Sequence, residues 1–130
     1  MALLILTAAL ALAAAPAPPR PLSADEHAAL RCSAAFALVS AGQVRGDPAA
    51  AQYPPLKLRG REFFVVTAAR LMDDAGLDEA GIKAAAEAEV AALRADGTAP
   101  LMPFCLALLD ASAPSAPPQG YAPEKAAPGG

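Results

Sequence analysis

The sequence predicts an all-α fold, a small bundle of about four helices tied by one disulfide. Alanine-rich stretches carry apolar residues at i, i+3 and i+4 spacing, which is the period of an amphipathic helix. Capping residues stand at the ends of these stretches, and two cysteines bracket nearly all of them. At 130 residues the chain has the size of one domain, which we place at residues 22–111.

Residues 1–21 are predicted to be a signal peptide followed by an extended lead-in. Leu3 to Ala15 is an uncharged apolar run of 13 residues, whereas a helix needs about 20 to span a bilayer. Small residues in the A-x-A pattern occur at the end of this run, although no Lys or Arg precedes it. We therefore expect a periplasmic or secreted protein whose mature chain has no stable membrane span.

Residues 112–130 are predicted to be a disordered tail, because their Pro, Gly, Ser and Ala bury too little apolar surface to offset ordering entropy. The remaining domain of about 90 residues is small, and alanine buries little area. Its core must therefore depend on a few large side chains. These are Leu30, Phe36, Val39, Phe64, Leu71, Met72, Ile82, Leu93, Phe104 and Leu108.

The first helix is predicted to begin after Ser23. Ser23 and Glu26 form an S-x-x-E capping box, in which each side chain bonds the other residue's backbone amide. This helix is predicted to run to about Ala41, and Gly42 is the expected residue just past its end. Residues 43–55 are expected to form a connection.

Three further helices are predicted along the chain. One covers about Leu56–Ala75 and ends at Gly76, with a short strand over residues 63–66 as the alternative. The next has Asp78 as its N-cap and runs to about Ala95. The last covers about Pro103–Ala111, with proline in its first turn. For the helix predicted over about Leu56–Ala75, the helical wheel gives a core face of Phe64, Val65, Ala68, Leu71, Met72 and Ala75.

Cys32 and Cys105 are predicted to form a structural disulfide. Both fall on apolar stripes of different helices, and two cysteines in an exported chain allow one intramolecular pairing. The alternatives are two buried free thiols, an intermolecular link and a reactive thiol. The chain has no C-x-x-C, and His27 does not share a helix face with Cys32, so redox catalysis is not expected.

The sequence offers no motif for catalysis, a cofactor or a metal. It has one histidine and lacks glycine-rich phosphate loops and the G-x-S-x-G pattern. The acidic group Asp73, Asp74, Asp78 and Glu79 fits a helix end followed by an N-cap better than a calcium loop. A net charge of −3 without a basic cluster disfavours nucleic-acid binding. We expect a protein that is not an enzyme and holds no cofactor.

The candidate partner surface consists of Lys57, Arg59, Arg61, Phe63 and Val66. The three cations stand at a helix N-terminus, where the dipole disfavours them, so another interaction must account for them. That interaction is either tertiary pairing, for example with Asp47 or third-helix carboxylates, or an anionic partner. The two apolar residues are expected on the charged side of the helix, either covered by another segment or forming a partner site.

The leading functional hypothesis is an exported, non-enzymatic helical module that binds or supports an envelope or secreted protein. An acid-stress chaperone of the small periplasmic kind is the alternative, because such chaperones are similar in build. Protonating all 13 carboxylates and His27 would change the net charge from −3 to about +11 and could open a small core. A secreted immunity or inhibitor protein has the same build. The oligomeric state stays open.

Overall fold

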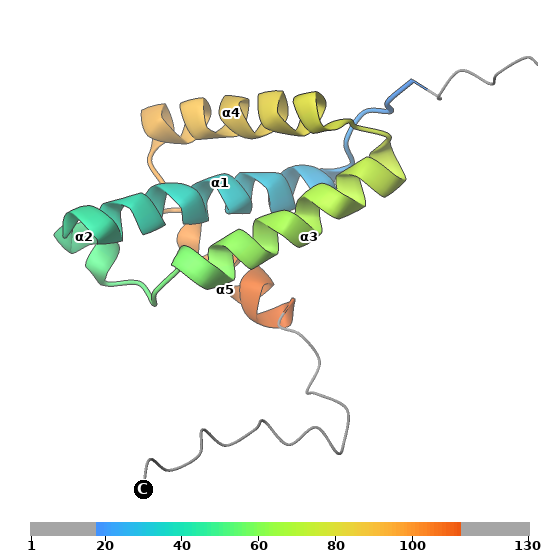
Figure 1. Ribbon diagram of the computed structural model, residues 1–130. Helices are drawn as coiled ribbons and strands as arrows, with labels where there is room; N and C mark the ends of the chain where they lie inside the picture. The colour runs from blue at the N-terminus through green and yellow to red at the C-terminus, as the bar shows by residue number, and fades with distance from the viewer. Residues whose placement is uncertain (1–17, 113–130) are drawn as a thin grey trace, which may run out of the picture.

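The computed structural model describes residues 18–112 of the chain, and within that range it contains five α-helices and no strand. The predicted all-α bundle is therefore confirmed (Figure 1). The proposed signal peptide and tail lie almost wholly outside the described residues. The helices are α1 (Ala24–Arg45), α2 (Pro48–Ala51), α3 (Lys57–Ala75), α4 (Glu79–Asp96) and α5 (Met102–Ala111).

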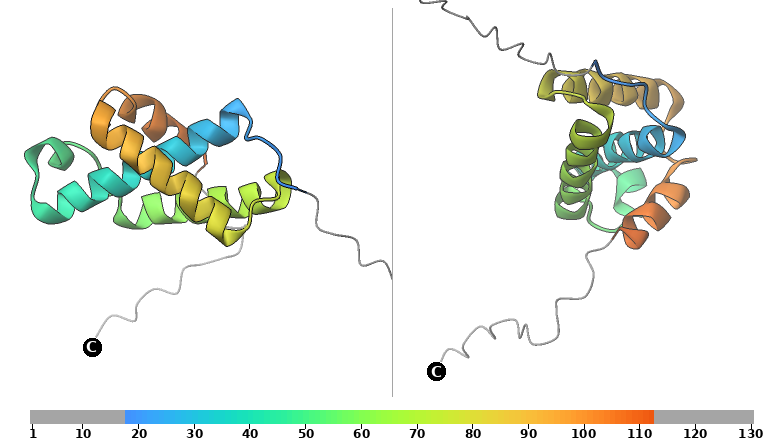
Figure 2. Two further views of the ribbon diagram at one scale, coloured as in Figure 1. Left: turned by 90° about the horizontal axis from the view of Figure 1, so that it is seen from above. Right: turned by 90° about the vertical axis from the view of Figure 1, so that its right-hand side faces the viewer.

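Helix α1 is the centre of the bundle and contacts each of the other four helices. The views in Figure 2 place α3, α4 and α5 around it. Every residue from Cys32 to Phe36 is buried, so this part of α1 is covered on all sides. Most side chains in that run are small, which lets neighbouring helices come close from several directions.

Two glycines mark the places of closest helix approach. A Cβ on Gly60 of α3 would lie 2.9 Å from the Cβ of Phe36, and one on Gly42 of α1 would lie 2.8 Å from the Cβ of Ala50. Both distances are shorter than real carbon contacts. Each helix pair can therefore pack as it does only because these positions lack a side chain.

The expected end of the first helix at Gly42 is wrong. Helix α1 continues to Arg45, and Gly46, with φ of 73°, ends it in the left-handed conformation. Gly42 is instead a buried residue within α1, and its missing side chain lets α2 pack closely against α1. Helix α2 was not expected within the predicted connection. Asp47 caps it by accepting a hydrogen bond from the Ala49 amide, and proline occupies its first turn.

Gln43 organises the connection from α2 to α3. Its Nε2 lies within hydrogen-bond distance of the carbonyl oxygens of Ala50, Tyr53 and Pro54, at 2.9 to 3.2 Å. Its Oε1 accepts from the Leu56 amide at 3.1 Å. One side chain on the last turn of α1 thus provides hydrogen-bond partners for backbone groups of a segment that has few backbone–backbone hydrogen bonds.

The other helix ends follow the predicted signals. The Ser23–Glu26 capping box is present, with the Glu26 amide donating to Ser23 Oγ at 3.2 Å and the Ser23 amide donating to Glu26 Oε2 at 2.8 Å. Asp78 Oδ1 accepts from the Gly81 amide at the start of α4. Gly76 ends α3 at φ of 73°.

The predicted core face of α3 is wrong by part of a turn. Val65 and Met72 were expected inside, but they are 57% and 46% exposed. The face that packs on α1 is defined by a glycine and a threonine as much as by apolar residues, because α3 must come close to α1. Its buried residues are Gly60, Phe63, Thr67, Leu71 and Ala75. Phe104 of α5, another expected core residue, is 53% exposed.

The buried residues form two clusters. The larger surrounds the disulfide and joins α1 to α2, α3, α5 and the end of α4; among its members are Phe36, Leu56, Leu93 and Met102. The smaller lies at the other end of α1 and consists of Leu30, Leu71 and Ile82. Leu77 and partly buried residues of α3 and α4 pack on it. Each cluster contains few large side chains, as the alanine-rich composition predicted.

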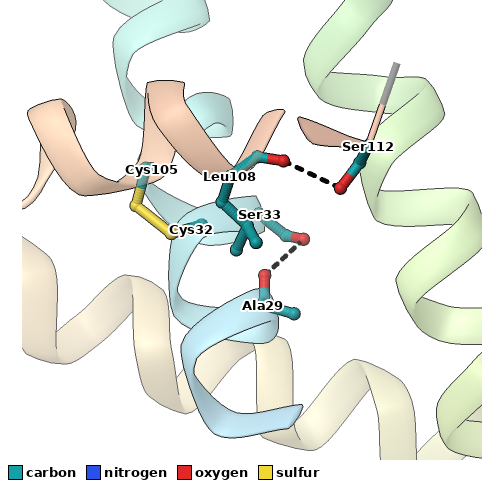
Figure 3. Close-up of a disulfide and its surroundings, with 6 residues drawn as sticks. All are labelled: Ala29, Cys32, Ser33, Cys105, Leu108 and Ser112. Carbon is teal, nitrogen blue, oxygen red and sulfur yellow. Dashed lines mark hydrogen bonds between the residues drawn. A yellow bond between two sulfur atoms is a disulfide. The ribbon is translucent and has the colours of Figure 1, made fainter. Parts of the chain in front are cut away.

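The disulfide between Cys32 and Cys105 is present and fully buried, and it links the middle of α1 to α5 (Figure 3). Both cysteines of the chain are used, so neither is free. In the same view Ser33 donates a hydrogen bond from its Oγ to the Ala29 carbonyl at 2.9 Å. Ser33 is buried beside Cys32, and this bond satisfies its hydroxyl within α1.

Replacing both cysteines should destabilise the domain strongly. The bond joins cysteines 73 residues apart. A crosslink that closes a loop of that size lowers the entropy of the unfolded chain, which stabilises the fold by about 4 kcal/mol. We expect Cys32→Ala/Cys105→Ala to lose about that much free energy of unfolding in urea titrations. The reduced wild-type protein is the control and should unfold at a similar urea concentration. An unfolding midpoint equal to that of the oxidised protein would contradict this role.

Candidate functional site

The basic run at the start of α3 does not form one patch. Lys57 and Arg61 are four residues apart and share one side of the helix, whereas Arg59 lies about 200° around the helix from each. Arg59 Nη2 lies 2.8 Å from Asp110 Oδ1 of α5. Arg59 therefore pairs with a carboxylate of α5, and not with Asp47 or a carboxylate of α4. Across residues 18–112, no carboxylate lies within ion-pair distance of Lys57 or Arg61.

The two apolar members of the candidate surface have different environments. Phe63 is only 8% exposed, and its ring packs edge to face on Phe36 with the centroids 5.4 Å apart. It is therefore a core residue, held by α1. Val66 is 52% exposed and remains on the surface of α3.

Val66 lies on one wall of a groove bounded by α1, α3 and α5. The groove has a volume of about 940 Å³. Phe104 and Leu108 of α5 form the facing wall, and Ala28 and Ala29 of α1 belong to the lining. Phe104 is exposed at this surface, as Val66 is. Two large apolar side chains therefore border the groove, and no segment of residues 18–112 covers them.

Charged residues border the same groove. Glu26 forms an ion pair with Arg20, with Oε1 2.6 Å from Nη2, and Arg59 is paired with Asp110. Asp25, Glu62 and Arg70 also belong to the lining, and within residues 18–112 they make no ion pair. The rim thus carries both signs of charge around an apolar interior.

A second groove, of about 720 Å³, lies between α3 and α4. Phe64, Ala68 and Met72 line it from α3. The α4 side contributes Ile82, Ala86, Val90 and Ala91, with Glu79, Lys83, Glu87 and Arg94 as its charged members. The two grooves therefore lie on opposite sides of α3.

Ion pairs join α4 to α1. Glu89 of α4 accepts from Arg31 Nη1 at 3.2 Å and lies 3.3 Å from His27 Nδ1. Arg31 Nη2 also lies 3.8 Å from Asp96 Oδ2. His27, the chain's one histidine, is thus part of an interhelical contact at the surface.

Other kinds of site were sought among residues 18–112. No three His, Cys, Asp or Glu side chains come together there as ligands of a metal ion would. In that range α1, α3 and α4 reach 18 residues or more, but none has the uninterrupted apolar length that crossing a bilayer requires.

The sequence missed the groove because its walls come from helices that are distant in the chain. Phe104 was expected in the core because it is one of the few large apolar side chains of the domain. It directly precedes Cys105, and adjacent helix residues point about 100° apart. When Cys105 faces α1, Phe104 therefore points to the side of that contact, so the disulfide prediction already disfavoured a central core position for it.

The comparisons with known proteins place this chain in no family. No family model, no curated protein and no solved structure matches it. Its function is therefore argued from its own residues.

The Arg20–Glu26 pair should make stability depend on pH. The Arg20 hydrogen bond and the Ser23 amide lower the pKa of Glu26 to about 2. Its ordinary pKa is about 4.3, so in acid the unfolded chain takes up this proton first. Glu26 thus stabilises the fold above about pH 4.3, and this contribution is lost as the pH falls toward 2.

Glu26→Gln should therefore flatten the dependence of unfolding free energy on pH between those two values. Urea titrations at a series of pH values measure the slope. Arg20→Gln removes the largest cause of the lowered Glu26 pKa and should flatten the same pH dependence. A slope that neither variant changes would show that the pair does not form in solution.

Proposed function

We propose that the protein is an exported, non-enzymatic binding module. Its groove between α1, α3 and α5 receives an amphipathic segment of another secreted or envelope protein, which inserts one or two large apolar side chains. The exported compartment is inferred from the buried disulfide, since such bonds persist in oxidising surroundings. The apolar run of residues 3–15 supports it, because it is typical of a signal peptide.

The observation that carries this proposal is the exposure of Phe104 and Val66 on two walls of one apolar groove. Large apolar side chains that border a concave surface mark binding sites more often than isolated exposed ones do. Aromatic residues are also enriched among the side chains that dominate protein–protein affinity. We therefore assign Phe104 the central contact.

The groove has one wall that is fixed covalently. Cys105 follows Phe104 directly and is bonded to Cys32 of α1, while Arg59 ties α3 to Asp110 at the other end of α5. A wall that a disulfide already holds does not have to be ordered when a partner binds, which lowers the entropic cost of association. This is a use for the disulfide beyond stability.

The partner's chemistry follows from the lining. The apolar interior selects large apolar side chains, and the rim carboxylates Asp25 and Glu62, with Arg70, favour a segment whose polar side has both signs of charge. A protein segment satisfies both requirements, whereas a strongly charged polymer satisfies neither.

Phe104→Ser should weaken partner binding while the fold is kept. A photo-crosslinking amino acid at Arg70, on the groove rim, would capture the partner in intact cells, and mass spectrometry would identify it. The purified partner is then titrated against wild type and variants by calorimetry. Loss of a central aromatic contact costs about 2 kcal/mol or more, so the Kd should rise about 30-fold.

Val44→Ser is the matched control. Val44 is 76% exposed near the end of α1 and does not line the groove, so its loss should leave the Kd unchanged. Circular dichroism verifies that both variants are folded. A partner that binds Phe104→Ser as tightly as wild type would exclude the groove as its site.

A second candidate is the acid-stress chaperone. The observation that favours it is the attachment of α4 to α1 through Glu89 and Asp96, paired with Arg31 and His27. Acid that neutralises these carboxylates would remove the ion pairs. Helix α4 could then separate and expose the small cluster of Leu30, Leu71 and Ile82.

Under this second hypothesis the protein should bind the hydrophobic dye ANS near pH 3 and suppress the aggregation of an acid-unfolded client protein there. Arg31→Gln removes the central cation and should move the onset of dye binding toward neutral pH. The partner-binding hypothesis instead predicts no dye binding and no client protection in acid. The two measurements together therefore separate the two functions.

A further inference from the structure

An apolar stripe runs along the outer face of α3, away from both clusters of the core. Leu58, Val65 and Met72 are 71%, 57% and 46% exposed. They are seven residues apart, so they lie on one face, two turns from one another, as residues of a helix–helix seam do. Nothing in residues 18–112 covers them. The stripe contains half of the six exposed large apolar residues in that range.

We propose that this stripe is a homodimer interface, in which α3 packs antiparallel on α3 of a second copy. The stripe is symmetric about its central residue. A two-fold axis at Val65 places Leu58 opposite Met72 of the second copy, and Val65 opposite its own counterpart. A surface that matches itself in this way is what an isologous dimer requires.

Small residues beside the stripe allow close contact. Ala68 and Ala69 lie next to it on its two sides, one partly buried and the other exposed. With Val65 on the axis, Ala68 and Ala69 come level with Glu62 and Arg61 of the second copy, so each small residue leaves space for a longer side chain across the interface.

The apolar surface also extends beyond the stripe. Met72 lines the groove between α3 and α4 together with Phe64 and Ala68, so the stripe and this groove are continuous. A specific interface needs about 800 Å² per partner. A helix about 28 Å long offers less than this along one edge, so α4 of each copy completes the contact. We expect a reversible dimer rather than an obligate one.

Charge favours the antiparallel arrangement. On the sides of α3 that flank the stripe, the first half carries Lys57, Arg61 and Glu62 and is net positive, while the second half carries Asp73 and is net negative. Antiparallel packing sets each half beside the oppositely charged half of the second copy. It also sets the helix dipoles in opposition, which removes the penalty that the basic start of α3 incurs alone.

One contact across this interface can be assigned to residues. Phe64 and Ala68 line the groove between α3 and α4. Lys57 and Arg61 precede them by helical spacings of three, seven and eleven residues, so they lie on the same side of α3, the side that faces α4. With Val65 on the axis, Lys57 of the second copy comes level with Asp73, beside the start of α4. Glu79 is exposed at that point. The interface therefore gives the unpaired Lys57 a carboxylate.

This dimer does not rest on the proposed partner groove. The groove that contains Phe104 lies on the other side of α3 and stays open in the dimer. A Phe104 variant should therefore dimerise like wild type, and a dimer variant should bind the groove's partner normally. Failure of one proposal leaves the other intact.

The test is the dimer dissociation constant of the purified, disulfide-bonded chain, measured by sedimentation equilibrium over a wide range of concentrations. Val65→Glu brings two like charges together at the axis and should weaken the dimer at least tenfold. Val44→Glu makes the same change at an exposed site near the end of α1 and should leave the constant unchanged. At concentrations well below the dimer dissociation constant, thermal unfolding should be similar for both variants, because both positions are exposed in the monomer.

A charge swap tests the orientation. Lys57→Glu and Glu79→Lys should each weaken the dimer severalfold, and the double variant should recover most of the loss. A wild-type chain that stays monomeric throughout, or a dimer that tolerates Val65→Glu, overturns the interface. A double variant no better than the worse single variant overturns the antiparallel arrangement.

Discussion

Close approach to α1 is the constraint on which the rest of the structure depends. A domain of this size with few aromatic residues cannot fill wide gaps between helices, so its helices must lie near one another. Small side chains on α1 and the two packing glycines, Gly42 and Gly60, make that possible. The disulfide from Cys32 fixes α5 in the same region of α1. The disulfide lies one turn of α1 from Phe36, where Gly60 packs, so the covalent bond and close packing reinforce each other there.

Sequence reasoning predicted what is determined locally or by pairing. The capping box of Ser23 and Glu26, the cap at Asp78 and the bond between the cysteines each depend on a few residues whose chemistry allows little else. It failed where tertiary distance decides. A glycine that ends a helix and a glycine that admits a neighbour look alike in sequence, so Gly42 was taken for a helix end. The one-turn helix α2 was missed with it.

The core face of α3 shows the same limit. Apolar content favoured a face through Val65 and Met72, but burial follows Gly60 and Thr67, because proximity to α1 matters more there than hydrophobicity. Phe63 was therefore grouped with the surface residue Val66, although it packs on Phe36. The candidate surface survives only in part, since its groove needs the position of α5, which no local pattern gives.

Helix α3 therefore separates two surfaces of different character. On the α5 side, the disulfide fixes one wall covalently and the exposed Arg59–Asp110 pair adds a weak contact, which suits a binding groove of constant shape. On the α4 side, Ile82 and Leu93 pack into the two core clusters, and the surface ion pairs of Arg31 and His27 add individually weak contacts. The division of the basic run, with Arg59 on one side and Lys57 and Arg61 on the other, gives each surface its own cations. Neutralising the run as a whole would affect both surfaces, so only single substitutions can assign their roles.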